Sequence, residues 1–265
     1  MVLPNEIGDA AQEADDYSVA RVKAWLDSGG DVNDVDKDGY TLIHCCAIGD
    51  QDCSEIHDGH VSLARTLIAL GADVNIPTHC PGVDKNTPLL NASRADSAGP
   101  GEAALDMIKL LLDAKANPNA RTPSGENSLK VAIAEIYYDR DTSLEVIRML
   151  LRAGASLDCI KRDSGEIITA EDIMSRCYDE DYDYDEAVIA MKALIAGVRK
   201  HGTYKKYMRA PHREFLALRG LAQRGKLAVQ IGTYGSRGHS ALEFLARLGD
   251  NGVCWHILTY WRATD

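Results

Sequence analysis

Long apolar runs and aromatic side chains are scarce in this chain of 265 residues. Only two Phe and three Trp are present, so we expect an aliphatic core built from Leu, Ile, Val and Ala. No stretch approaches the roughly 18 consecutive apolar residues that a membrane helix requires. The segment 1–16 holds five acidic residues and no apolar run typical of a secretory signal. These absences favour a location inside the cell, in the cytoplasm or the nucleus.

Catalytic signatures are also missing. The chain has no Gly-x-Ser-x-Gly elbow, no His-Glu-x-x-His pair and no kinase motif. The glycine-rich segment 231–238 lacks the Gly-Lys-Ser/Thr ending of a phosphate loop, and no strand clearly precedes it. We therefore expect a protein that is not an enzyme and that binds no cofactor.

Cysteine and acidic residues raise two metal hypotheses. The seven cysteines are odd in number, which suits reduced thiols. Zinc ligands by residue type cluster within seventeen residues: His44, Cys45, Cys46, Cys53, His57 and His60. The cluster has no paired Cys-x-x-Cys, and Cys45 and Cys46 point in different directions on one helix. The acidic run 179–186 lacks the central glycine of a calcium-binding loop. We therefore favour ordinary packing of the Cys and His residues and a solvated loop for the acidic run, and we expect no metal ion.

Four apolar helical segments each end in a turn of one type. The turns are Gly29–Asn33, Leu70–Asn75, Lys115–Asn119 and Ala153–Asp158. Internal repetition of this kind is typical of a solenoid, because one repeat must stack on its neighbours to bury its core. Each of the first three turns is followed by a short segment that leads into the next helix. These segments are Asp38–His44, Asn86–Leu90 and Gly125–Lys130.

These segments resemble the ankyrin repeat, in which a Gly-Ala-Asp-Val-Asn turn and Asp-Gly precede a Thr-Pro-Leu-His helix start. Thr41 and Thr87 suit helix N-caps, and Pro88 suits a first helical turn. The resemblance covers roughly residues 5–198 and implies an all-α solenoid of stacked helix pairs with short hairpin-like turns. It predicts about four repeats after an N-terminal capping helix pair. In the family, the histidine at the position of His44 ties adjacent repeats together.

The repeats are longer than the roughly 33 residues of the family. The spacings between Asn33, Asn75, Asn119 and Asp158 are 42, 44 and 39 residues. Roughly six to nine extra residues fall mainly between the two helices of each pair, and insertions at equivalent places map to one face. The inserted turns are acidic, and the strongest candidates are Asp52, Glu55, Asp58, Asp181 and Asp183. They predict either solvated loops or an acidic ridge that attracts a basic partner.

Charge divides the chain in two. The net charge is −11, but residues 199–265 carry twelve Lys/Arg against four acidic residues, which leaves −19 for residues 1–198. We expect an ankyrin array with elongated acidic inter-helix turns over 1–198, and a basic linker with a small helical segment over 199–265. That segment is similar to tails on ankyrin arrays of single-celled algae. Lys205, Lys206 and Arg209, beside tyrosines, suit nucleic acid or an anionic surface; alternatively, the tail caps the array.

The resemblance implies a protein-binding scaffold or adaptor. In the family, finger tips and first helices line a concave binding surface. Tyr40, Val83, Asp84 and Lys85 are therefore the partner-contact candidates. We expect a monomer with a protein partner, and binding of nucleic acid or an anionic surface through the tail is the alternative function.

Overall fold

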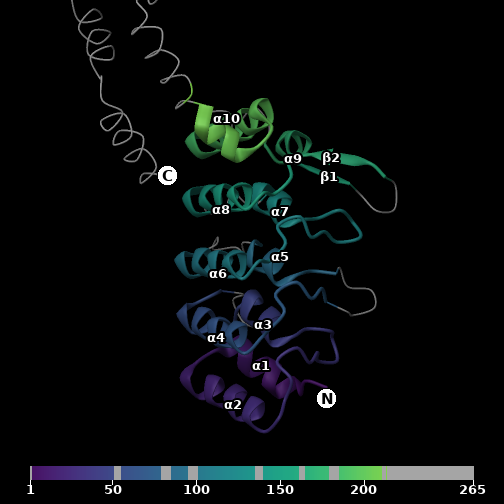
Figure 1. Ribbon diagram of the computed structural model, residues 1–265, viewed down its shortest axis with the longest axis vertical. Coiled ribbons are helices and arrows are strands. Elements are labelled where there is room, and N and C mark those ends of the chain that lie inside the picture. The colour runs from purple at the N-terminus through teal and green to yellow at the C-terminus, as the bar shows by residue number, and fades with distance from the viewer. Residues whose placement is uncertain are drawn as a thin grey trace, which may run out of the picture. The chain divides into compact units, whose positions relative to one another are not determined.

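A computed structural model describes residues 2–50, 55–78, 85–94, 101–134, 140–160, 165–178, 185–210 and 213 (Figure 1). The chain divides into two compact units, Met1–Arg199 and Lys200–Asp265. The helices expected near the C-terminus, between His212 and Asp265, lie outside the described residues. The elements below belong to the first unit, except that its last helix continues two residues into the second unit.

The described part of the first unit contains ten helices in five consecutive pairs. The pairs are α1 (Asn5–Glu13) with α2 (Asp16–Asp27), α3 (Leu42–Ile48) with α4 (Asp58–Ala69), α5 (Pro88–Ala92) with α6 (Glu102–Asp113), α7 (Ser128–Ala134) with α8 (Arg140–Arg152), and α9 (Ala170–Cys177) with α10 (Glu186–His201). Figure 1 shows them stacked in chain order. The expected all-α solenoid of helix pairs is confirmed.

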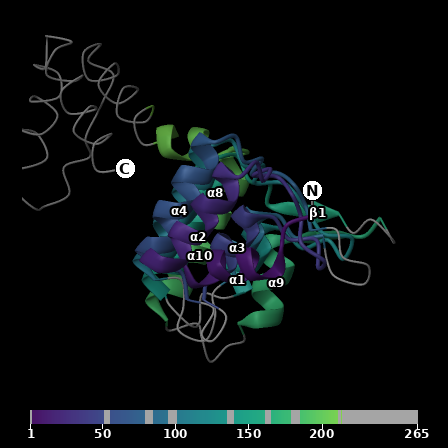
Figure 2. The ribbon, with the colours of Figure 1, turned by 90° about the horizontal axis from the view of Figure 1, so that it is seen from below.

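Two sides of the stack differ. We call the first helix of each pair the inner helix, the second the outer helix, and the hairpin-like segment before each inner helix a finger. Seen from below, the inner helices lie between the outer helices and the fingers (Figure 2). The last finger contains two short antiparallel strands, β1 (Asp158–Ile160) and β2 (Ile167–Thr169), with Cys159 opposite Ile168. The sequence predicted only hairpin-like turns there.

Aliphatic side chains fill the space between successive pairs. The largest fully buried ones include Leu42, Ile43, Leu63, Leu67, Leu89, Leu90, Met107, Ile108, Leu111, Leu129 and Ile133. They come from inner and outer helices alike, so each pair buries its core only against its neighbours. Thr41 and Thr87 are the N-caps of α3 and α5, as expected, and Pro88 begins α5.

Each of the first four outer helices is followed by a residue with positive φ. Three of these residues are glycines, namely Gly29 (φ 100°), Gly71 (φ 95°) and Gly154 (φ 94°). The fourth is Lys115, with φ 69°. A side chain in this left-handed region costs roughly 1–2 kcal/mol, because its Cβ approaches the following carbonyl oxygen.

We expect Lys115→Gly to raise the free energy of unfolding by about 0.5–1 kcal/mol. The gain is smaller than the strain removed, because glycine also increases the entropy of the unfolded chain by roughly 0.5–1 kcal/mol. Urea unfolding followed by circular dichroism measures the change. The reverse substitution at the equivalent position, Gly71→Lys, is the control and should destabilise. A loss of stability in Lys115→Gly would contradict the assignment of strain.

Candidate partner-binding site

Three asparagines join successive turns in the same way. Each side-chain amide donates to a carbonyl of the next turn and accepts an N–H two residues further on. The contacts are Asn33 Nδ2 to Gly71 O (3.2 Å) with Asp73 N to Asn33 Oδ1 (2.7 Å), Asn75 Nδ2 to Lys115 O (3.2 Å) with Asn117 N to Asn75 Oδ1 (2.8 Å), and Asn119 Nδ2 to Gly154 O (3.1 Å) with Ser156 N to Asn119 Oδ1 (2.8 Å). This asparagine ladder fixes the spacing of consecutive fingers.

The corresponding residue of the last described turn is Asp158, which cannot donate as an amide does. Its carboxylate instead accepts from Arg199, with Nη1 at 2.9 Å from Oδ2 and Nη2 at 2.8 Å from Oδ1. Arg199 also binds Glu171 through two further hydrogen bonds, one of them from Nε to Oε1 at 3.0 Å. These bonds hold the pKa of Glu171 below its usual value, against the opposing effect of partial burial. Arg199 thus gives Asp158 the hydrogen bonds that a following turn gives to each asparagine of the ladder.

His44 connects the first two fingers. Its Nδ1 accepts the backbone N–H of Thr41 at 3.2 Å, and its Nε2 lies 3.2 Å from the carbonyl oxygen of Asn86 in the next finger. Because Nδ1 accepts, the ring proton is on Nε2, which donates to Asn86. The expectation that His44 ties adjacent repeats together is therefore confirmed.

His57 and His60 connect α4 to the preceding repeat. His57 Nδ1 accepts from Gly59 N at 3.1 Å, and its Nε2 bonds to Glu13 O at 3.1 Å. His60 Nδ1 accepts from His57 N at 3.1 Å, and its Nε2 bonds to Gln12 O at 2.5 Å. The two carbonyl groups belong to the last residues of α1, which a helix leaves without partners of its own. The imidazoles cap α1 from the next repeat.

The Cys and His residues of the zinc hypothesis therefore have structural positions. The three histidines use both ring nitrogens in hydrogen bonds that involve the backbone. Cys45 and Cys46 are buried, and burial raises the pKa of each thiol well above its usual value, so both are protonated. Cys53 lies outside the described residues. Within the part of the chain that the structure describes, no group of three potential ligands could hold a metal ion.

The first finger places Tyr40 directly before α3. Asp36 Oδ1 accepts the N–H groups of Asp38 and Tyr40, each at 2.9 Å, and Asp36 N donates to Tyr40 O at 2.9 Å. The half-buried Tyr40 ring meets the His44 ring edge-on, with 6.1 Å between centroids. In the second finger Lys85 is exposed. Its neighbours Val83 and Asp84, the other two contact candidates, lie outside the described residues.

A charged cluster beside the third finger was not foreseen from the sequence. Glu126 bonds to Arg94 of the preceding repeat at 3.2 Å and lies 4.0 Å from Lys130 on α7. The i,i+4 spacing of Glu126 and Lys130 is a local signal. The contact with Arg94 spans 32 residues and carries no such signal.

The geometry described so far is that of a repeat array, and the comparison with known families decides which one. The model of the ankyrin repeat matches residues 38–79 and 84–123. These two segments are ankyrin repeats. The matched residues hold α3 to α6 and the turns that follow α4 and α6. A search of the curated proteins finds no significant match. The number of repeats and the likeness of the tail to algal tails stay predictions.

The acidic residues of the repeat array are not all in the inserted turns. Asp58 was expected in a turn, but it is the first residue of α4. Two further acidic residues, Glu102 and Glu186, begin α6 and α10. At these places a carboxylate interacts favourably with the helix dipole, which explains the acidity of the positions without a partner.

Of the other acidic-turn candidates, only Glu55 is described. It is exposed, and its carbonyl accepts the N–H of Asp50 at 3.1 Å, which closes the turn before α4. Asp52, Asp181 and Asp183 lie outside the described residues. The acidic ridge therefore stays a prediction.

The basic-tail candidates lie in the second unit, on a helical segment at 204–210. Lys205, Lys206 and Arg209 are exposed. Thr203 begins the segment, since its Oγ1 accepts the N–H of Lys206 at 3.2 Å. Among the described residues, no helix is long and apolar enough to cross a membrane.

Proposed function

We propose that this ankyrin-repeat protein is a non-catalytic adaptor or scaffold that binds another protein across its fingers and inner helices. Ankyrin repeats are generally protein–protein interaction modules. The asparagine ladder carries the proposal, because its repeated bonds hold successive fingers at a fixed spacing. Side chains on different fingers then form one pre-organised surface, which lowers the entropy lost on binding.

The character of the finger side suits a protein partner. Lys37 and Asp38 are exposed on the first finger and Lys85 on the second, and Glu126 pairs with Arg94 beside the third. Both signs of charge are therefore present on this side, together with the half-buried Tyr40. Complementary charges of mixed sign select one protein surface over another, whereas a nucleic acid presents a single sign.

Capture from extracts of the source cell tests this proposal. We expect Tyr40→Ala combined with Lys85→Glu to reduce recovery of the partner at least tenfold, because the pair removes an aromatic contact and reverses a charge. The matched control is Lys109→Glu, which reverses an exposed charge on the outer helix α6. Quantitative mass spectrometry compares the captured proteins. Equal recovery with the finger variant and the control would contradict binding through the fingers.

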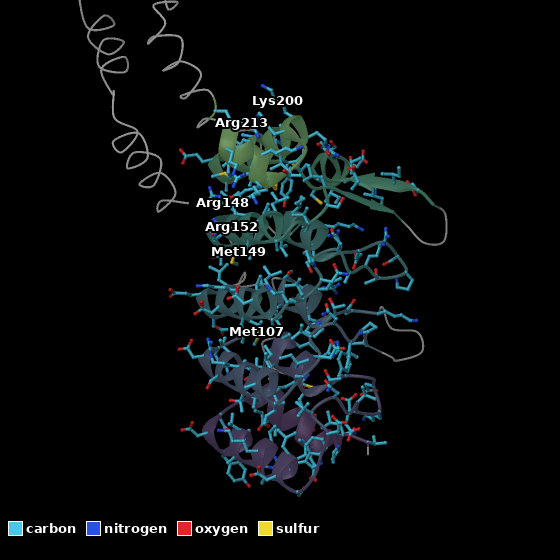
Figure 3. The ribbon with its side chains drawn as sticks, viewed as in Figure 1. Met107, Arg148, Met149, Arg152, Lys200 and Arg213 are labelled. Carbon is cyan, nitrogen blue, oxygen red and sulfur yellow. The ribbon has the colours of Figure 1, made fainter. Side chains whose placement is uncertain are left out.

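The second unit supports a different candidate function, binding of nucleic acid or an anionic surface. Lys205, Lys206 and Arg209 are exposed there, and the rings of Tyr204 and Tyr207 lie 6.4 Å apart. Figure 3 labels two further basic residues of this unit, Lys200 and Arg213. Basic groups interleaved with aromatic rings suit a phosphate backbone and stacked bases.

The second candidate has its own test, in the full chain. If it holds, Lys205→Glu with Lys206→Glu should weaken RNA binding and reduce the salt slope by about one per lysine. The outer-helix variant Lys109→Glu should leave both unchanged. RNA binding that is absent, or that does not depend on salt, would rule this candidate out.

A further inference from the structure

Three histidines in the α3–α4 pair share one arrangement. In each, Nδ1 accepts a backbone N–H at the start of a helix, and Nε2 lies against a backbone carbonyl of a neighbouring repeat. The carbonyl groups are Asn86 O for His44, Glu13 O for His57 and Gln12 O for His60. The pair is therefore joined to the repeats on both sides by imidazole groups.

All three arrangements require a neutral ring with its proton on Nε2. A protonated imidazole carries a hydrogen on Nδ1 as well, so it cannot accept the N–H groups of Thr41, His57 and Gly59. Protonation would replace three hydrogen bonds at the starts of α3 and α4 with donor–donor contacts. The rings of His57 and His60 also lie only 3.9 Å apart, centroid to centroid, so two positive charges there would repel each other.

The later repeats lack this arrangement at the equivalent position. In place of His44, α5 has Leu90, α7 has Lys130 and α9 has Asp172. None of these side chain types changes its charge between pH 5 and 8 at its ordinary pKa. Acid sensitivity of this kind is therefore confined, among the described inner helices, to α3.

We propose that the α3–α4 pair is an acid-sensitive joint, which loosens from α1 and from the second finger when its imidazoles are protonated. The pairs α7–α8 and α9–α10 stay packed under the same conditions. The joint would control the first finger as well, since Tyr40 lies against His44.

Charged groups around the joint also affect how readily its imidazoles are protonated. The ionisable residues that lie near these contacts in the sequence are, by element, Asp9 and Glu13 on α1, Asp15 and Asp16 at the start of α2, Asp36 and Lys85 on the fingers, Cys45 and Cys46 on α3, Asp50 and Glu55 in the turn, and Asp58 on α4. Of these, Asp15 interacts electrostatically with His57, Asp50 with His60, and Asp9 and Asp36 with Cys45. Asp50 favours protonation of His60. The carboxylates of Glu13 and Asp15 already accept hydrogen bonds from Ser18, and the buried thiols are neutral.

Burial decides the direction in which the pKa of His60 is shifted. Its side chain is 0% exposed, and desolvation lowers its pKa below the usual value, with a further lowering from His57. The unfolded chain then binds a proton at a higher pH than the folded protein does. Stability is therefore full above about pH 6.5 and falls as the pH decreases through that value.

Hydrogen exchange of the full chain tests the proposal. Between pH 7.5 and 5.5, after correction for the chemical exchange rate, we expect protection of amides in α1, α3 and α4 to fall about tenfold or more. Protection in α7 and α8 should change less than twofold. A uniform loss over all helices, or no loss in α3 and α4, would overturn the proposal.

Glutamine variants show whether the imidazoles are responsible. Glutamine can also accept a backbone N–H and donate to a carbonyl, but it does not titrate. We expect His44→Gln and His60→Gln each to reduce the acid-induced loss of protection, and His201→Gln in the second unit to leave it unchanged. Acid sensitivity of wild-type size in both glutamine variants would contradict the proposal.

If a variant fails to fold, an NMR titration of the wild-type chain decides instead. The proposal requires the amide resonances of α1 and α4 to shift together with the titrating imidazole of His60. Imidazoles that titrate without any response from those amides would overturn it.

Discussion

Replacing Gly59 with alanine is expected to lower the free energy of unfolding by about 3 kcal/mol, at the upper end of the usual effect of overpacking. A Cβ at this position would lie 2.2 Å from the carbonyl oxygen of Ala14 and 2.8 Å from Cε1 of His57. The first of these is a backbone atom, so it cannot move aside without separating α4 from the end of α1. Urea unfolding monitored by circular dichroism gives the change.

Gly101 provides the matched control, because it also lies at the start of an outer helix. It is the N-cap of α6, and a Cβ there would meet nothing within 4 Å. We expect Gly101→Ala to cost less than about 1 kcal/mol, through the weaker capping by alanine. Equal effects of the two substitutions would show that α4 does not pack against Ala14 as described.

Tyr178→Ala should cost about 3–5 kcal/mol, the usual range for removal of a large buried aromatic side chain. Tyr178 follows α9 and is only 4% exposed. Its hydroxyl donates to the carbonyl of Ile133 at 2.7 Å, with the carbonyl of Ala134 at 3.0 Å. These are the last residues of α7, so the tyrosine caps the inner helix of the preceding repeat, as His57 and His60 cap α1.

The substitution Tyr178→Phe separates the contribution of the hydroxyl group to stability from that of the ring. We expect it to cost about 1–1.5 kcal/mol, because the hydrogen bond is lost while the packing stays. Tyr17, which is 73% exposed on α2, is the control, and Tyr17→Ala should change the stability little. Thermal and urea unfolding measure all three. If Tyr178→Ala and Tyr17→Ala were equally mild, the contact between α9 and α7 would be refuted.

The repeated turn and the helix start after it were sufficient to predict the stack of helix pairs. The sequence shows Asn33, Asn75 and Asn119 at equivalent places in successive turns. It does not show their role, because each side-chain amide bonds to a turn about 40 residues away. The beginning of α4 was misplaced. Asp58 was expected in the turn, whereas it begins the helix, and the N-cap is His57, whose Nδ1 accepts the N–H of Gly59.

Long-range ion pairs were the least predictable part. Arg199 bonds to Glu171 and Asp158 across 28 and 41 residues, and no local pattern indicates such a choice of partners. Tyr178 was missed for the same reason. The candidate contacts Tyr40 and Lys85 came from the family resemblance, and the structure adds the finger geometry that surrounds Tyr40.

The central claim is that a partner protein lies on the fingers and inner helices. The most direct measurement is site-specific photo-crosslinking in the source cell, with a photoreactive amino acid placed at Lys85 on the second finger or at Lys109 on the outer helix α6. Both side chains are exposed, so the two probes are matched in access. If the partner binds through the fingers, we expect a discrete protein adduct from position 85 and none from position 109. Protein adducts from position 109 alone would contradict it.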